Sequence, residues 1–117
     1  MALHLHTGQL GEDLAAEWLT AQGFRILHRN WRFGHVELDV VAEKLGCLHF
    51  VEVKTRRSDK FGYPEEAVTA GKLERLQRAG AAYLEQEPHW KRIQYDILSI
   101  RLIPKGAPEF FFIEDVS

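Results

Sequence analysis

Two neighbouring segments near the middle of the chain are strongly apolar but carry charged residues at every second position. Successive side chains of a β-strand point to opposite faces, so Glu37 and Asp39 would share one face of the first segment. Glu52 and Lys54 would share one face of the second segment by the same rule. The short connection at residues 43–46 predicts that the two strands form a hairpin.

Capping residues and hydrophobic periodicity place further elements around this hairpin. Thr7 as an N-cap and Gly23 as a stop predict a first helix, and Thr69 and Pro88 bracket a second one. The predicted elements are a helix at 8–22, a strand at 24–29, a turn at 30–34, strands at 36–41 and 48–55, a helix at 70–87, and strands at 93–100 and 109–114. This α-β-β-β-α-β-β order predicts an α/β fold with a central mixed sheet flanked by helices.

Length and composition narrow the class of protein. A chain of 117 residues fits a single domain spanning residues 1–117. Its one cysteine, Cys47, excludes an intrachain disulfide and a zinc cluster made of thiolates. No apolar run approaches the roughly 18 residues that cross a bilayer, and residues 1–10 do not resemble a signal peptide. We therefore expect a cytoplasmic protein with no membrane partner.

The charged residues of the two strands suggest a site for phosphate chemistry. If their charged faces coincide, Asp39 and Glu52 converge on a hard cation such as Mg²⁺, which prefers carboxylate, water and phosphate oxygens. Lys54 beside them would position a water or offset charge on a phosphoryl group. The alternative is an ordinary hairpin with one solvated face and cross-strand ion pairs. The spacing of the charges is compatible with both interpretations.

Glu12 occupies an unexpected position on the first predicted helix. At 100° per residue it lies about 200° from Leu10, between Leu19 and Ala16, outside the arc that holds the other polar residues. An acidic residue among small and apolar neighbours suggests a partly buried site. The alternative is that Glu12 stabilises the positive N-terminal end of the helix.

Basic residues near the carboxylates are candidate contacts for nucleic acid. The net charge is −2, so binding to DNA or RNA would depend on a local basic patch. The candidates are Arg56 and Arg57, which follow Lys54, and Lys72, Arg75 and Arg78, which are spaced by three along the second helix. These groups would contact phosphates, and the aromatic residues Trp31, Phe61 and Tyr63 would stack on unpaired bases. Ordinary solvated side chains are the alternative.

The charge pattern also resembles that of known nucleases. Glu37-Leu38-Asp39, followed after twelve residues by Glu52-Val53-Lys54, resembles the D-(X)n-(D/E)-X-K signature of restriction-endonuclease-like nucleases. A wider ordered set of residues resembles the YraN-like family of small bacterial proteins, also called UPF0102. The set comprises Gly11-Glu12, Ala15, Trp18-Leu19, Gly23-Phe24, Asn30-Trp31-Arg32, Glu37-Leu38-Asp39, Phe50-Val51-Glu52-Val53-Lys54-Thr55-Arg56, Phe61-Gly62, Ala67-Val68, Lys72 and Tyr95-Asp96. It covers roughly residues 8 to 100.

The resemblance implies a fold, an activity and a set of site residues. The family is similar in fold to archaeal Holliday junction resolvases, which implies a restriction-endonuclease-like core. It implies a Mg²⁺ or Mn²⁺ site at Asp39 and Glu52, a catalytic Lys54, and an accessory carboxylate at Glu12 that completes the acidic site directly or through water. Lys72 would approach the scissile phosphate. The expected function is a metal-dependent endonuclease acting on DNA, with branched or flapped DNA as candidate substrates.

Two other classes of function remain open at this stage. One is a non-catalytic nucleic-acid-binding module that keeps the same fold. The other is a protein-interaction domain that uses the aromatic strand at 109–114, whose exposure would also permit a homodimer. Two histidines spaced by two could bind a metal, but the six histidines offer no third ligand, so we expect adventitious or structural roles for them. Cys47 is expected to be an inert small residue.

Overall fold

A computed structural model describes residues 3–57 and 69–117, with side chains from residue 9 onward. Its elements are α1 (Leu3–Ala21), β1 (Arg25–Phe33), β2 (Val36–Lys44), β3 (Cys47–Arg57), α2 (Ala70–Gln86), β4 (Ile93–Leu102) and β5 (Glu109–Ile113). The five strands form one sheet in the order β1-β2-β3-β4-β5, with β3 and β4 parallel and the other neighbours antiparallel. The predicted α/β class and mixed sheet are confirmed. Phe61 and Tyr63 lie outside the described residues.

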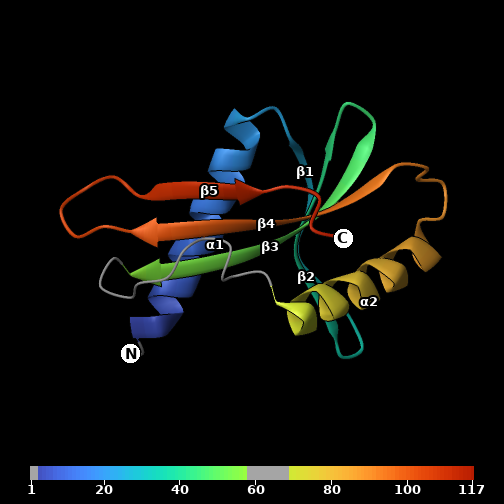
Figure 1. Cartoon of the computed structure of the whole chain (residues 1–117), viewed down its shortest axis with the longest axis horizontal. Coiled ribbons are helices and arrows are strands. Elements are labelled where there is room, and N and C mark those ends of the chain that lie inside the picture. The colour runs from blue at the N-terminus through green and yellow to red at the C-terminus, as the bar shows by residue number, and fades with distance from the viewer. Residues whose placement is uncertain (1–2, 58–68) are drawn as a thin grey trace.

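The two helices cover opposite faces of the sheet (Figure 1). Ala15 and Leu19 of α1 join a buried cluster with Val51 and Leu98, whereas α2 packs on a second cluster that contains Phe50. Helix α2 belongs to the crossover that joins the parallel strands β3 and β4, as a parallel pair requires. No helix in the described part of the chain is long and apolar enough to cross a membrane.

Helix α1 begins earlier than predicted and lies very close to β3. It starts at Leu3, so Thr7 lies inside the helix and is not its N-cap. The sequence before Thr7 contains no residue that breaks a helix, which allows the extra turn. The predicted stop at Gly23 is confirmed by its φ of 96°. A Cβ at Gly11 would lie 2.0 Å from Thr55 Oγ1, so only glycine permits this approach of α1 to β3.

Strand β1 runs through the segment where a turn was predicted. The prediction of a turn at 30–34 was wrong, because β1 continues to Phe33. Asn30 adopts the left-handed backbone conformation, with a φ of 54°, and the strand bends at this residue. Asparagine tolerates this conformation better than most residues. The neighbouring pairs Arg29–Val40 and Trp31–Leu38 place Asn30 opposite Asp39 of β2.

The bend at Asn30 coincides with a change of face along β2. The alternation that puts Glu37 and Asp39 on one face would put Leu38 and Val40 together on the other. Instead, Leu38 belongs to the cluster under α2 and Val40 to the cluster under α1. Strict alternation therefore breaks at the residue between them, Asp39. The beginning of β2, next to the β1–β2 turn, lies near α2 (Figure 1), and Asp39 lies where the two faces exchange.

Helix α2 starts as predicted and packs closely on the sheet. The Thr69 side chain caps it by accepting a hydrogen bond of 3.2 Å from the backbone N–H of Lys72. Further along the helix, a Cβ at Gly80 would lie 2.8 Å from the Tyr95 ring and 3.0 Å from the Phe50 ring. Because glycine has no side chain at this contact, α2 lies close to the sheet, with its first turn beside the beginning of β2.

Candidate active site between β2, β3 and α2

Asp39 and Glu52 lie side by side where β2 and β3 stop pairing. The last pair of the β2–β3 ladder at this end is Val40–Val51, and Asp39 and Glu52 are the next residues on the two strands. Asp39 Oδ2 accepts a hydrogen bond of 2.8 Å from the backbone N–H of Val53, so a side chain continues the ladder. The predicted hairpin is confirmed, and it brings the two carboxylates together.

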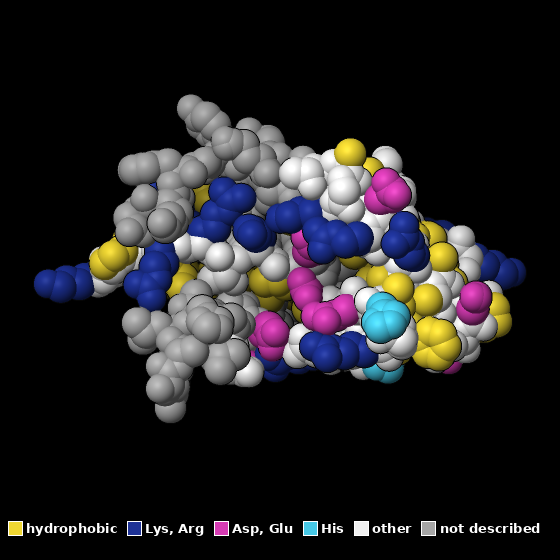
Figure 2. Space-filling model, turned by 90° about the horizontal axis from the view of Figure 1, so that it is seen from below, with side chains coloured by type: hydrophobic (Ala, Val, Ile, Leu, Met, Phe, Trp, Pro, Cys, Tyr) yellow, Lys and Arg dark blue, Asp and Glu magenta, His cyan; other side chains and the backbone are white. Residues whose placement is uncertain are grey.

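A cavity of about 530 Å³ opens beside this point. Its charged lining comes from three elements: Glu37 and Asp39 of β2, Glu52 and Lys54 of β3, and Lys72, Arg75 and Arg78 of α2. Figure 2 shows acidic side chains on this face bordered by Lys and Arg side chains. The cavity therefore has an acidic floor and a basic border, an arrangement suited to a cation together with a polyanion.

Asp39 is the carboxylate whose protonation is most affected by its surroundings. Burial, followed by the charges of Glu52, Glu37 and Glu12, raises the pKa of Asp39 to about 6. The hydrogen bond from the Val53 N–H opposes this rise, because it stabilises the ionised carboxylate. The negative charges near Asp39 are thus only partly offset by the hydrogen bond from Val53. A bound cation would stabilise the ionised carboxylates at this position.

Lys72 supplies part of the missing positive charge. Its Nζ lies 3.7 Å from Glu52 Oε2, and the two side chains are only 18% and 21% exposed. Burial, then the neighbouring charge of Lys54, lowers the pKa of Lys72, with Arg56 and Arg75 acting in the same direction. Lys72 is therefore a partly desolvated ammonium group between a carboxylate and other cations. The sequence placed Lys72 near the site but did not predict its ion pair with Glu52.

Glu12 approaches the same region from the opposite side of the sheet. Its Oε1 accepts a hydrogen bond of 3.0 Å from Asn30 Nδ2, and it does not line the described cavity. Its charge nevertheless contributes to the raised pKa of Asp39. Glu12 thus belongs to the outer part of the acidic cluster, where the bend at Asn30 holds it.

The predicted phosphate contacts fall into two groups. Lys72 and Arg75 line the cavity as part of its basic border. Arg56 lies on the same face of β3 as Lys54, beside Arg101 of β4, but outside the cavity. Arg57 is exposed and, by strand alternation, faces the other side of the sheet.

One aromatic side chain predicted to stack on bases packs inside the protein. Trp31 makes an edge-on contact with Tyr83 of α2, with ring centroids 5.2 Å apart. It is partly buried beside the apolar cluster under α2. This contact follows from the extension of β1 beyond Asn30, which the predicted turn did not allow.

The donor set decides which metal would suit the site. Within residues 9–57 and 69–117, no three His, Cys, Asp or Glu side chains converge closely enough to hold a metal alone. Asp39 and Glu52 offer two hard carboxylates, and Mg²⁺ is usually held by one or two carboxylates together with water and substrate phosphate. The residues therefore fit Mg²⁺ or Mn²⁺ whose remaining ligands come from water and substrate.

Comparison with known proteins identifies the family. The model of a family described as "Uncharacterised protein family UPF0102" matches residues 11–100. The chain belongs to the UPF0102 family. A UPF0102 protein of Mycolicibacterium vanbaalenii is 41% identical over 111 residues, which cover 94% of this chain and 92% of that protein. The UPF0102 proteins of Rhodococcus opacus, 40% identical over 98% of both chains, and Syntrophomonas wolfei, 48% identical over 80% of this chain and 82% of that protein, are also similar.

The UPF0102 match contains the whole candidate site. It begins at Gly11, the glycine that contacts Thr55, and ends at Ile100 in β4. Glu12, Asp39 and the other site residues all lie inside this range, whereas β5 lies beyond it. The family resemblance seen in the sequence is thus confirmed.

Proposed function

We propose that this UPF0102 protein is a metal-dependent nuclease that hydrolyses phosphodiester bonds in DNA. One observation carries the proposal: the partly buried carboxylates of Asp39 and Glu52 meet beside Lys54 in a cavity bordered by basic residues. Two hard ligands and an ammonium group provide the parts that phosphoryl chemistry requires.

Each side chain of the site has a distinct role in the proposal. Asp39 and Glu52 hold Mg²⁺ or Mn²⁺, which when bound lowers the pKa of water and polarises the phosphate. Lys54, on the same strand face as Glu52, orients the attacking water. Lys72 lies close enough to Glu52 to bind a phosphate oxygen that enters the cavity. Glu12 is an accessory carboxylate that acts through the electrostatics of Asp39.

The charge distribution supports a nucleic acid as the partner. The chain as a whole carries a net charge of −2, yet Lys72, Arg75 and Arg78 lie together along one side of the cavity. Local cations of this kind bind phosphates and release counterions, so binding should weaken steeply with salt. DNA in the cytoplasm, branched or flapped, is the proposed substrate, and a homodimer would present two sites to paired strands.

The test is a cleavage assay with end-labelled single-stranded, duplex, flapped and four-way-junction DNA, in Mg²⁺, Mn²⁺ or EDTA. We expect metal-dependent cutting by the natural chain, lost in Glu52→Ala and Lys54→Ala. The exposed residues Glu17 and Lys91 provide matched controls, and Glu17→Ala and Lys91→Ala should cut normally.

Three results would contradict the nuclease proposal. Salt-sensitive retention of DNA without cutting in either metal would indicate the non-catalytic binding module. No retention of any DNA would favour the protein-interaction domain. Cutting that survives in Glu52→Ala would place the activity elsewhere or in a contaminant.

A further inference from the structure

A second cavity lies on the α1 face of the sheet, opposite the acidic site. It has a volume of about 430 Å³ and is lined by residues of α1, β3, β4, β5 and the β2–β3 turn. Trp18 of α1 and His49 of β3 are among them. The volume lies in the usual range for sites that bind small molecules. None of the residues proposed for phosphodiester cleavage lines this cavity.

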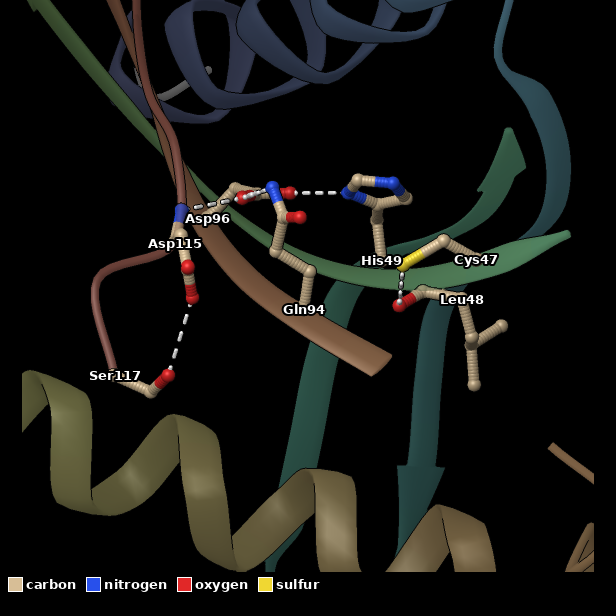
Figure 3. A network of polar contacts seen from close by, with 7 residues as sticks. All are labelled: Cys47, Leu48, His49, Gln94, Asp96, Asp115 and Ser117. Atoms are coloured by element: carbon tan, nitrogen blue, oxygen red, sulfur yellow. Dashed lines mark hydrogen bonds and ion pairs between the residues drawn. The ribbon is translucent and has the colours of Figure 1, made fainter. Parts of the chain in front are cut away.

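His49 is the most constrained polar group in this cavity. Its side chain is 6% exposed, and its Nδ1 lies 2.7 Å from Oδ2 of Asp96, which is completely buried. Asp96 Oδ1 also accepts hydrogen bonds of 2.9 Å from Gln94 Nε2 and from the backbone N–H of Asp115 (Figure 3). Because the Asp96 carboxylate can only accept, Nδ1 carries the proton in this contact.

The other ring nitrogen of His49 is directed away from Asp96 (Figure 3). Within residues 9–57 and 69–117, Nε2 has no hydrogen-bond partner, and His49 lines the cavity. The edge of the Phe24 ring packs against the imidazole, with centroids 4.8 Å apart, and fixes its orientation. Asp96 binds Nδ1 and the Phe24 ring fixes the orientation of the imidazole. Nε2 is therefore the nitrogen that is available to a ligand in the cavity.

Charged residues around the cavity favour an anion as that ligand. Lys44 Nζ lies 5.0 Å from the centroid of the Phe24 ring, and Arg92 Nη1 donates a hydrogen bond of 3.3 Å to the Leu45 carbonyl. Both contacts hold the cationic groups beside the cavity that they line. Glu114 is the one carboxylate among the lining residues of the described chain, so cationic groups outnumber it.

Aromatic side chains form the apolar part of the lining. Phe112 lies 5.7 Å from Phe24 and 5.5 Å from Trp18 between ring centroids, and all three line the cavity. Rings arranged in this way offer faces and edges to a flat ligand. We infer that this cavity binds a small planar anion, a ring that bears a phosphate or carboxylate and meets His49 Nε2 and Arg92. A mononucleotide and an aromatic carboxylate share this chemistry.

The test follows the His49 ring by NMR while ligands are added. The His49 Hε1 signal is assigned by its absence in His49→Gln, and the probes are AMP, benzoate, adenosine and inorganic phosphate. We expect a saturable shift with AMP or benzoate, with Kd on the order of 1 mM or below, and affinities at least about tenfold weaker for adenosine and phosphate. A response to AMP alone supports a nucleotide site, and a response to both ring anions supports a general one.

Variants separate this cavity from the acidic site. Arg92→Met should weaken binding about tenfold, because it removes an exposed cation without disturbing the core. Arg78→Met on α2 and Glu52→Gln in the acidic cavity should leave the affinity unchanged. The inference is overturned if neither ring anion shifts His49 up to about 10 mM. It is also overturned if Arg92→Met and Arg78→Met bind alike, or if Glu52→Gln abolishes binding.

Discussion

Asp39 Oδ2 accepts a 2.8 Å hydrogen bond from the backbone N–H of Val53, and this contact lies just beyond Val40–Val51, the last pair of the β2–β3 ladder. This contact gives Asp39 a structural task in addition to its proposed chemical one. It replaces a strand–strand hydrogen bond and keeps the carboxylate beside Glu52, its neighbour across the ladder. The same contact partly offsets the cost of burying a charge at this point.

The raised pKa of Asp39 predicts how stability depends on pH. A folded-state pKa of about 6 means that the folded protein binds the proton more tightly than the unfolded chain. The contribution of Asp39 to stability is therefore full below about pH 4 and falls as the pH rises to about 6. Asp39→Asn should be more stable than the natural chain by about 2 kcal/mol at pH 7.5, with little difference at pH 4.

Urea unfolding at the two pH values measures this effect. Asparagine keeps an oxygen that can accept from the Val53 N–H, so the variant tests the charge and not the hydrogen bond. Glu85→Gln, at an exposed position of α2, is the control and should change stability little at either pH. A loss of stability at pH 7.5 in Asp39→Asn would show that the buried charge is compensated.

The contact between Gly11 and Thr55 predicts a strong effect of one methyl group. Gly11→Ala would place a Cβ 2.0 Å from Thr55 Oγ1, so α1 must shift from β3, at a cost of about 2 kcal/mol. Gly71→Ala on α2 is the matched control, because no atom lies within 4 Å of the added Cβ. It should stabilise the protein by about 0.5 kcal/mol through helix propensity. Equal thermal midpoints for the two variants would contradict the close contact.

The buried carboxylate of Asp96 predicts that the C-terminal residues depend on it. Asp96→Ala removes the acceptor of three hydrogen bonds, from His49, Gln94 and the Asp115 backbone, and should lower the free energy of unfolding by about 3 kcal/mol. Hydrogen exchange at the Asp115 amide should accelerate in the same variant. Glu114→Ala, at an exposed neighbouring position, should change neither quantity. Unchanged exchange at Asp115 in Asp96→Ala would refute this role.

Local rules predicted much of the fold and the centre of the site. The period of two grouped Glu37 with Asp39 and Glu52 with Lys54. The short turn predicted a hairpin in which the two charged faces could coincide, and Asp39 and Glu52 do lie together at the end of the ladder. Gly23 and Thr69 marked helix ends correctly because their roles depend on backbone conformation and a local hydrogen bond. Each of these features is decided within a few residues, so the sequence carries it directly.

Other features depend on contacts between distant segments. Asn30 was assigned to a turn, although its positive φ bends a continuing strand and exchanges the faces of Leu38 and Val40. The pair of His49 and Asp96 joins residues 47 positions apart, which no periodicity within one element reveals. The available signal for this pair was that His49 and Asp96 are polar residues in the apolar segments that form β3 and β4.

The ion pair between Lys72 and Glu52 predicts the response of nucleic-acid binding to salt. Lys72→Met should weaken DNA retention and reduce the slope of log affinity against log salt concentration by about one, because one phosphate contact is lost. The measurement is a series of binding titrations from low to physiological salt, in EDTA to prevent cutting. Lys91→Met, an exposed substitution after α2, should leave the slope unchanged. Equal slopes for the two variants would remove Lys72 from the binding surface.

The most direct test of the account is Mn²⁺ binding, measured by electron paramagnetic resonance of the free ion. The natural chain should show a saturable site that is weakened at least about tenfold in both Asp39→Asn and Glu52→Gln. Glu74→Gln, on the exposed face of α2, is the matched control and should bind Mn²⁺ like the natural chain. Equal Mn²⁺ affinities in all four proteins would contradict the claim that Asp39 and Glu52 together form the metal site.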